Sequence, residues 1–292
     1  MMKIYTLTFL GMLGTTTIVA APINESMDAA ADGTVSISNI SGSVDVQGWS
    51  RNQVEVTGEL GGDVEELIFK RDGDEIEIKV KARRRGSHDI ESDLVVKVPQ
   101  GSALEVNTVS ADIDVAEVAG EQSLESVSGD IATEAHASDI DVNTVSGDLE
   151  VEGDNQSMRS RLSSVSGEID TENLAGEIGI DSVSGDLVVA NGVFSRASLG
   201  AVNGEIVFHA QLLNDGRLDI ETVNGGVDVE FAGDVSARFD IETFNGDIRN
   251  CFGPKAVRVS EYGPGYELVF TEGDGSGRVT IETLNGDLRL CK

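Results

Sequence analysis

The sequence repeats one five-residue phrase, whose first complete copy reads Val127-Ser128-Gly129-Asp130-Ile131. Three more copies keep Ser-Gly, four carry Asn-Gly, and two degenerate copies lie upstream. The glycine position is filled by Gly42, Ala111, Gly129, Gly147, Gly167, Gly185, Gly204, Gly225, Gly246 and Gly286. From Ala111 to Gly246 the step is 18 to 21 residues, and the last step is 40. A fixed period of about 20 residues is the signature of a repeat architecture.

Each phrase places bend-forming residues between apolar, mostly β-branched ones. Gly reaches positive φ at no steric cost, and Ser, Asn and Asp bond to nearby backbone. Alternation continues outward, as in Ile140, Val142 and, after one irregular step, Val145, which is typical of strands. A single unit cannot bury its own faces, so units must stack. We therefore predict an all-β fold, a parallel and right-handed β-solenoid with rungs of about 20 residues over residues 101–292.

The polar residue before each glycine is expected to form a ladder along the solenoid axis. Its members are Ser110, Ser128, Ser146, Ser166, Ser184, Asn203, Asn224, Asn245 and Asn285. Stacked polar side chains of this kind add hydrogen bonds along the axis. A nucleophilic serine is the alternative, but catalysis uses one residue rather than nine, and none of these serines lies in a Gly-x-Ser-x-Gly elbow.

The chain resembles the bacterial "putative adhesin" family of β-strand-repeat domains, whose function is undefined. The resemblance rests on the Thr/Ser-Val-Ser-Gly-Asp-Ile phrase, on the lead-in from Asp93 to Pro99, and on the stretch from Leu104 to Ser110. It extends over residues 34–292. The resemblance implies a solenoid fold, an exported or envelope-associated protein and no known activity, and it carries no catalytic residues to transfer.

The N-terminal third differs from the regular repeat. Residues 1–20 combine Lys3 with an apolar run that ends at Ala20, which predicts a cleaved signal peptide and no transmembrane segment in the mature protein. Residues 21–33 are expected to be a loose leader. Residues 34–100 contain strand patterns but lack the phrase after Gly42, so we predict irregular rungs or an antiparallel β cap there.

Basic residues gather in this N-terminal region. Lys79, Lys81, Arg83, Arg84 and Arg85 form a cluster, with Lys70 and Arg71 nearby. Such a cluster is a candidate site for an anionic glycan, a lipid headgroup or an acidic partner. Equally, it is the kind of charge that protects exposed strand edges.

The two cysteines occupy the same place in two copies of the repeat, because Cys251 and Cys291 each follow a phrase glycine by five residues. On adjacent rungs their Cα atoms would lie about 5 Å apart, which suits a disulfide. An exported protein meets an oxidising compartment. We predict a Cys251–Cys291 disulfide, with a reactive or metal-binding pair as the alternative. Residues 252–280 lack a central phrase and form either an excursion or a deformed rung.

Charge limits the partners of this chain. It contains 52 Asp+Glu and 21 Lys+Arg, for a formal charge of −31, which disfavours nucleic acid. The acids that follow the phrase glycine would stack as like charges, and such oxygen ladders can recruit Ca²⁺. They are Asp112, Asp130, Asp148, Glu168, Asp186, Glu205, Asp247 and Asp287. The calcium β-roll nonapeptide is absent, so no cofactor is predicted.

Function is the least determined property. No pair of acids stands out from the repeated ladder, and phosphate loops and His-Glu-x-x-His motifs are absent. We therefore expect no enzyme, but a binding or scaffold module in the bacterial envelope with a protein or glycan partner. A surface adhesin and a polysaccharide-processing enzyme are the alternatives. The periplasm is the expected location, with the cell surface or the medium as alternatives.

Overall fold

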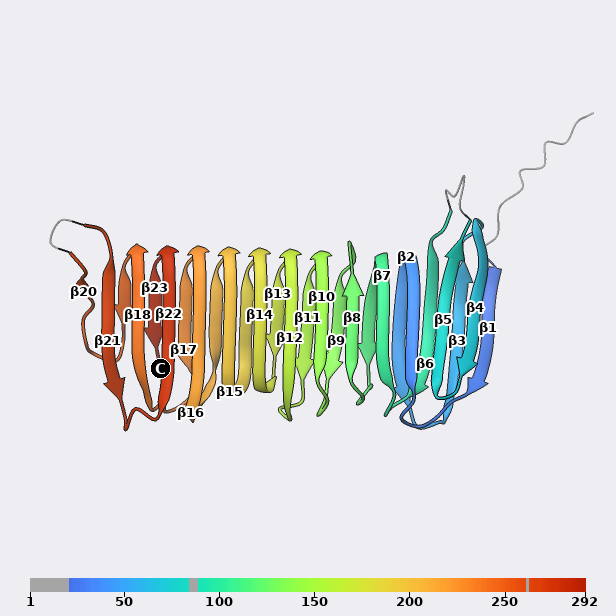
Figure 1. Ribbon diagram of the computed structural model, residues 1–292, viewed down its shortest axis with the longest axis horizontal. Coiled ribbons are helices and arrows are strands. Elements are labelled where there is room, and N and C mark those ends of the chain that lie inside the picture. The colour runs from blue at the N-terminus through green and yellow to red at the C-terminus, as the bar shows by residue number, and fades with distance from the viewer. Residues whose placement is uncertain (1–20, 84–88, 261–262) are drawn as a thin grey trace, which may run out of the picture.

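The computed structural model describes residues 21–83, 89–260 and 263–292. The predicted signal peptide therefore lies outside the described residues. Within them, the chain forms strands β1 to β23 and no helix, so no helix is available that could cross a membrane. The strands stand side by side in one long stack with two layers (Figure 1). The prediction of an all-β solenoid is confirmed.

Each rung of the stack contributes one strand to each of two layers, here called sheet I and sheet II. Sheet I contains the strands that precede the phrase. In spatial order they are β4 (Val64–Asp72), β5 (Glu75–Ala82), the first halves of β2 (Thr34–Trp49) and β7 (Ala103–Ala116), β8 (Gln122–Ser126), β10 (Ile140–Ser146), β12 (Ser157–Ser166), β14 (Ala175–Ser184), the second halves of β15 (Leu187–Asn203) and β16 (Ile206–Asn224), β22 (Gly277–Asn285), β18 (Ala237–Asn245), β21 (Tyr266–Glu272) and β20 (Val257–Arg258).

Sheet II contains the strands that follow the phrase. Its order is β1 (Ala21–Asp28), β3 (Gln53–Leu60), β6 (Ser92–Pro99), the second halves of β2 and β7, β9 (Ile131–Ala135), β11 (Leu149–Gly153), β13 (Ile169–Glu172), the first halves of β15 and β16, β17 (Val227–Phe231), β23 (Leu288–Cys291) and β19 (Ile248–Asn250). Neighbouring rungs pair in parallel, and antiparallel pairs occur toward the two ends of the stack.

The core lies between the two sheets. Side chains alternate between core and solvent along each strand, so that Ile140 and Val142 of sheet I face Leu149 and Val151 of sheet II across a dry interior. Toward the C-terminal end the core becomes aromatic, and the Phe239 and Phe270 rings stack with their centroids 4.4 Å apart. Each buried aliphatic side chain contributes about 1.5–3 kcal/mol, so the repeated pattern holds the rungs together.

The phrase glycine is required by close stacking of backbones. A Cβ added at Gly147 would lie 2.2 Å from the carbonyl oxygen of Gly129 in the preceding rung, and one at Gly167 would lie 2.0 Å from that of Gly147. Positive φ, which the sequence suggested, occurs at only some of these glycines, such as Gly185 (145°). Contact with the previous rung is therefore the more general reason for glycine.

The N-terminal region departs from the expectation in two ways. Residues 21–28 form strand β1, which pairs with β3, and are therefore not a loose leader. The physical reason is that β3 would otherwise leave a row of backbone groups unpaired. In addition, β2 stacks in register on β7 as a regular rung, with Gly42 beside Ala111. Strands β3 and β4 are antiparallel to β6 and β5, respectively, and end the two sheets together with β1.

At the C-terminal end the rungs do not stack in chain order. Strands β22 and β23 lie between the rung of β16 and β17 and the rung of β18 and β19. In Figure 1 the red strand β22 accordingly stands between orange strands. Residues 252–276 make this possible, because β21 runs antiparallel on the outer side of β18 before the chain turns back. This stretch is an excursion with an antiparallel strand and not a regular rung.

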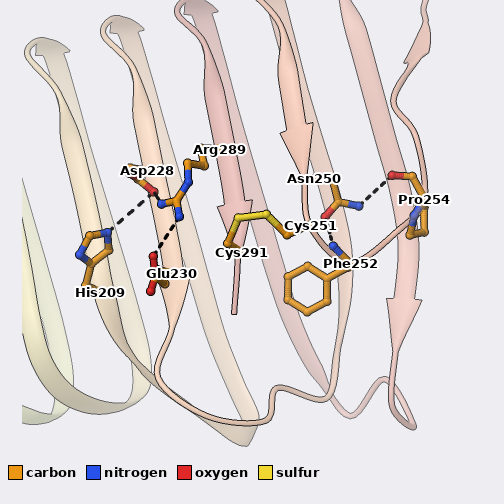
Figure 2. The surroundings of a disulfide bond; sticks show 9 residues. All are labelled: His209, Asp228, Glu230, Asn250, Cys251, Phe252, Pro254, Arg289 and Cys291. Carbon is orange, nitrogen blue, oxygen red and sulfur yellow. Dashed lines mark hydrogen bonds and ion pairs between the residues drawn. A yellow bond between two sulfur atoms is a disulfide. The ribbon is translucent and has the colours of Figure 1, made fainter.

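The insertion brings the two cysteines together. Cys251 and Cys291 form a disulfide with their Cα atoms 4.9 Å apart, as predicted (Figure 2). Adjacent rungs are required for that distance, and β23 is the direct neighbour of β19. The bond therefore joins strand β23 to the neighbouring rung that contains β19, although the two cysteines are 40 residues apart in the sequence.

Replacing Gly147 by Ala should destabilise the protein by about 1–3 kcal/mol, because the new methyl group collides with the carbonyl of Gly129. Urea unfolding measured by circular dichroism checks this. Gly179→Ala is the matched control, since a Cβ there meets no atom within 4 Å. An equal loss in both variants would contradict the stacking explanation.

Replacing both Cys251 and Cys291 by Ser should lower the free energy of unfolding by about 2–4 kcal/mol, since the loop between them is no longer closed. The chemical unfolding of the oxidised protein, the reduced protein and this double variant should be compared. Reduced and double-variant proteins should behave alike. An oxidised protein that unfolds no later than the double variant would contradict the prediction.

Candidate functional site

One edge of the solenoid carries a continuous row of exposed apolar side chains. Each is the residue two before a phrase glycine, and each is between 39% and 51% exposed. We call this set the apolar row; in spatial order it comprises Val109, Val127, Val145, Val165, Val183, Val202, Val223, Leu284 and Phe244. Contiguous exposed apolar surface of this kind marks interaction sites in soluble proteins.

Val145, which follows Val142 after one irregular step in the alternation, belongs to the apolar row and faces solvent. The residue one earlier, Thr144, is buried beneath the bend, so strand alternation turns Val145 outward. The bend then resets the alternation, and Leu149 returns to the core. Other copies of the phrase repeat this pattern, with a buried Ser or Thr three residues before the glycine. Apolar character alone could not distinguish the two sides, because both positions carry Val, Leu or Ile.

The apolar row ends in a groove. Val202, Val223, Leu284 and Phe244 form one side of it, and the segment that enters β21 forms the other, with Val259, Pro264 and Tyr266 among its described residues. The groove has a volume of about 850 Å³. We call it the C-terminal groove. Its far wall is braced by Arg258, whose Nε donates to the Tyr266 hydroxyl at 3.2 Å and whose guanidinium lies 5.5 Å from the ring centroid.

Carboxylates line the C-terminal groove beside its apolar side chains. Asp181, Glu221, Glu282 and Glu242 contribute to its lining, each two residues before a member of the apolar row or its rung equivalent. Burial raises the pKa of the Glu242 carboxyl, and repulsion from Glu267, Glu282 and Asp240 raises it further. The lining of the groove therefore has two parallel lines of side chains. One is the apolar row, and the other is the line of carboxylates two residues before it.

Three carboxylates near the groove have oxygen atoms within 4.8 Å of one another, those of Asp240, Glu242 and Glu267. Oxygen donors in such a group are the ligands that Ca²⁺ prefers. The ladder that the sequence suggested for calcium has a different role. Asp130 accepts a hydrogen bond from the backbone N–H of Asp148 at 2.9 Å, and Asp148 accepts one from Glu168 at 2.8 Å.

Three further Asp residues of that ladder behave in the same way. Asp112, Asp186 and Asp287 accept from the backbone N–H of the equivalent residue in the next rung. Five of the acids that follow the phrase glycine therefore satisfy backbone groups at the bend. Their carboxylates stabilise the stack instead of pointing freely into solvent.

The Asn members of the polar ladder hydrogen-bond to one another as predicted. Asn224 donates to Asn203 at 3.0 Å, Asn285 to Asn224 at 2.8 Å, and Asn245 to Asn285 at 2.8 Å. The order places Asn285 before Asn245 because the last rung is inserted. This ladder is structural along its Asn half.

The predicted basic cluster is only partly described. Lys79 and Lys81 lie on β5 and Arg83 follows it, whereas Arg84 and Arg85 fall outside the described residues. Lys81 is paired with Glu66 at 3.0 Å and with Glu65 at 3.5 Å. Carboxylates of the neighbouring strand β4 therefore balance the charge of Lys81.

The two histidines of the solenoid lie on sheet II, away from the C-terminal groove. His136 Nδ1 is 3.1 Å from an oxygen of Asp154. His209 Nε2 is 3.8 Å from Asp228, which Arg289 binds more closely at 2.6 Å (Figure 2). Glu230 binds the same guanidinium at 3.0 Å. The two histidines thus contact carboxylates on neighbouring rungs.

A comparison with known protein families decides the family. The model of the Toastrack DUF4097 family matches residues 33–290, nearly the whole chain after the predicted signal peptide. The chain belongs to the Toastrack DUF4097 family. This agrees with the resemblance inferred from the repeated phrase. No curated protein matches this Toastrack chain.

Solved structures resemble this Toastrack chain at low sequence identity. One described as a "putative lipid binding protein" from Parabacteroides distasonis supports the fold, with 10% identity, a TM-score of 0.51, and 91% of this chain and 96% of that chain covered. A "putative adhesin" from the same organism has 12% identity, a TM-score of 0.49 and coverage of 92% and 97%. Another from Bacteroides fragilis has 7% identity, a TM-score of 0.47 and coverage of 92% and 97%.

The acidic surface should make the protein more stable at mildly acidic pH. Neighbouring carboxylates and burial raise the pKa of Asp45, Glu168, Asp170 and Glu242 in the folded state. A raised pKa means that the folded protein binds protons more tightly, so stability increases as pH falls toward the unfolded-state values near 4. Calorimetry should show a higher melting temperature at pH 5 than at pH 7.5.

Glu242→Gln should raise the melting temperature at pH 7.5 and reduce its gain on acidification. Glu121→Gln serves as the control, because it removes one charge far from this cluster. A melting temperature that falls steadily from pH 7.5 to 5 would contradict the prediction.

Proposed function

We propose that this protein is an exported, non-catalytic binding module of the bacterial envelope. We further propose that its C-terminal groove takes an extended peptide segment of a partner protein that carries apolar and basic side chains. The observation that carries this proposal is the apolar row and its deepening into a groove of about 850 Å³. A volume of this size suits a ligand that is buried over much of its surface.

The charge pattern beside the apolar row determines the chemistry of the partner. Glu221, Glu282 and Glu242 stand next to Val223, Leu284 and Phe244, respectively. A segment with alternating apolar and basic residues would satisfy both lines at once, since side chains of an extended peptide alternate in direction. A second copy of this chain would bring carboxylates against carboxylates, which disfavours self-association through this edge.

Two observations support an exported location. The sequence begins with a predicted signal peptide, residues 1–20. The Cys251–Cys291 disulfide is typical of proteins outside the reducing cytoplasm. The periplasm is the proposed compartment, and an adhesin role would require display at the cell surface.

A binding role fits the repeat better than an enzymatic one. The groove is lined by repeated equivalents of the same residues, and its described lining residues include no His, Cys or Lys. Glu221, Glu282 and Glu242 are equivalents on successive rungs. Glu242, whose pKa is raised, gathers with two further carboxylates, Asp240 and Glu267, and, among the described residues, with no nucleophilic side chain of a recognisable catalytic arrangement.

The proposal predicts that the mature protein binds a short synthetic peptide of alternating Leu and Lys. Fluorescence anisotropy of the labelled peptide measures this binding. Phe244→Ser combined with Leu284→Ser should weaken binding about tenfold, because buried apolar area is lost. Val127→Ser combined with Val145→Ser is the matched control, since these residues occupy the same place in the repeat with similar exposure but lie outside the groove.

Two further peptides separate the contributions of charge and apolar contact. A Ser–Lys peptide keeps the charge and should bind weakly, and a Leu–Glu peptide should not bind. Equal binding of the Leu–Lys and Ser–Lys peptides would overturn the proposal, and so would equal effects of the two double variants.

A further inference from the structure

Four exposed arginines form a straight row on the outer face of sheet I. Arg196 pairs in register with Arg217, Arg217 with Arg278, and Arg278 with Arg238. Neighbouring strands are about 4.8 Å apart, so the four guanidinium groups stand one above another along the solenoid axis. We call this set the arginine row. Its four arginines come from four rungs. The inserted strand β22 places Arg278 between Arg217 and Arg238.

The arginine row is an unfavourable arrangement in isolation. Like charges directly opposite each other on neighbouring strands are destabilising. Within the described residues, Arg196, Arg217, Arg238 and Arg278 have no carboxylate at ion-pair distance, although the chain has 52 acidic residues to 21 basic ones. Arg278 donates only to the Thr280 hydroxyl, at 3.2 Å. A binding partner with negative charges would relieve the repulsion.

Other arginines of the solenoid show that pairing is available in this protein. Arg289 on sheet II contacts Asp228 at 2.6 Å and Glu230 at 3.0 Å. Arg159 on sheet I contacts Asp139 at 3.1 Å. Among the described residues, Arg161 and Arg249 also have no carboxylate at ion-pair distance, so what distinguishes the arginine row is the continuous register of four such arginines.

A hollow adjoins the first member of the arginine row. It has a volume of about 520 Å³, and its lining includes three arginines, Arg159, Arg161 and Arg196, and three carboxylates, Asp141, Glu177 and Asp181. The hollow exists because Gly179 stands between Arg161 and Ser198 in the register and has no side chain, and a Cβ there would meet no atom within 4 Å. Because Glu177 stands in register with Arg196, the unbalanced positive charge begins at Arg196 and continues along the row, away from the hollow.

We infer that the arginine row binds a linear acidic polysaccharide, whose carboxylate groups contact successive arginines. Guanidinium groups bind carboxylates in a planar, two-point geometry. A repeating polyanion matches a repeating row of cations. This surface lies on the outer face of sheet I and is separate from the C-terminal groove, so the inference does not depend on the peptide partner.

The width of the row favours a single glycan chain over a membrane surface. Asp219 and Asp240 lie two residues along the same strands from Arg217 and Arg238, and therefore on the same face. Glu221 and Glu242 follow two residues further. A broad anionic surface would meet these carboxylates as well as the arginines, whereas a single chain can follow the row alone.

The test uses the mature protein and a defined oligogalacturonate, a linear polyuronate, in isothermal titration calorimetry at low salt. Arg217→Gln combined with Arg278→Gln should weaken binding about tenfold or more. Arg249→Gln combined with Lys255→Gln is the matched control, because it removes the same charge from exposed positions outside the row and outside the basic cluster. Its affinity should stay within about twofold of the unmodified protein. Unchanged circular dichroism confirms that both variants fold, and the Arg217/Arg278 variant should melt no lower than the unmodified protein because repulsion along the row is reduced.

Four outcomes would overturn the inference. The first is no binding of the oligogalacturonate by the unmodified protein at low salt. The second is an equal loss in both double variants, which would indicate a general charge effect. The third is binding of phosphatidylglycerol vesicles that depends on Arg217 and Arg278 more strongly than polyuronate binding does, which would assign the row to a membrane. Equal binding of a neutral xylan oligosaccharide would likewise exclude carboxylate recognition.

Discussion

The structure depends on the close contact between the phrase glycine of one rung and the backbone carbonyl of the rung before it. At Gly147 and Gly167 there is no room for a Cβ, so the rungs approach each other in one register only. That register aligns every other position of the repeat. Buried aliphatic residues then stack on buried aliphatic residues, Asn on Asn, and the bend Asp on the backbone N–H of the next rung. A slip of one residue would exchange core and solvent faces.

The inserted C-terminal rung completes both proposed binding surfaces. Leu284 continues the apolar row between Val223 and Phe244, and Arg278 continues the arginine row between Arg217 and Arg238. Without β22, each row would be interrupted at the same place. The disulfide joins this rung to its neighbour and thereby preserves the continuity of the two surfaces. Stability and recognition are coupled through one strand.

In a repeat protein, an exposed residue type at one position of the repeat recurs on every rung. A single exposed apolar residue is ordinary on a protein surface, but nine at one position of the repeat form a continuous line. A single exposed Arg is equally ordinary, but four in register repel one another. We therefore expect partners of this fold to contact rows of equivalent residues. Neighbouring rows, which are two residues apart along each strand, differ in their chemistry. This explains how an apolar row, an acidic line and an arginine row share one face of an acidic protein.

The sequence by itself determined the solenoid, its period, the Asn ladder and the pairing of Cys251 with Cys291, because each follows from equivalent positions in a repeat. It did not determine that Val145 faces solvent, since hydrophobicity is the same on both sides of the bend and only the buried Thr144 sets the alternation. Nor did it place residues 21–28 in a strand, because their pairing with β3 depends on an unpaired edge that exists only in the folded state. The groove and the arginine row were likewise decided by tertiary structure. Both require β22 to lie between β16 and β18, out of chain order, and no local pattern in residues 277–285 specifies its neighbours.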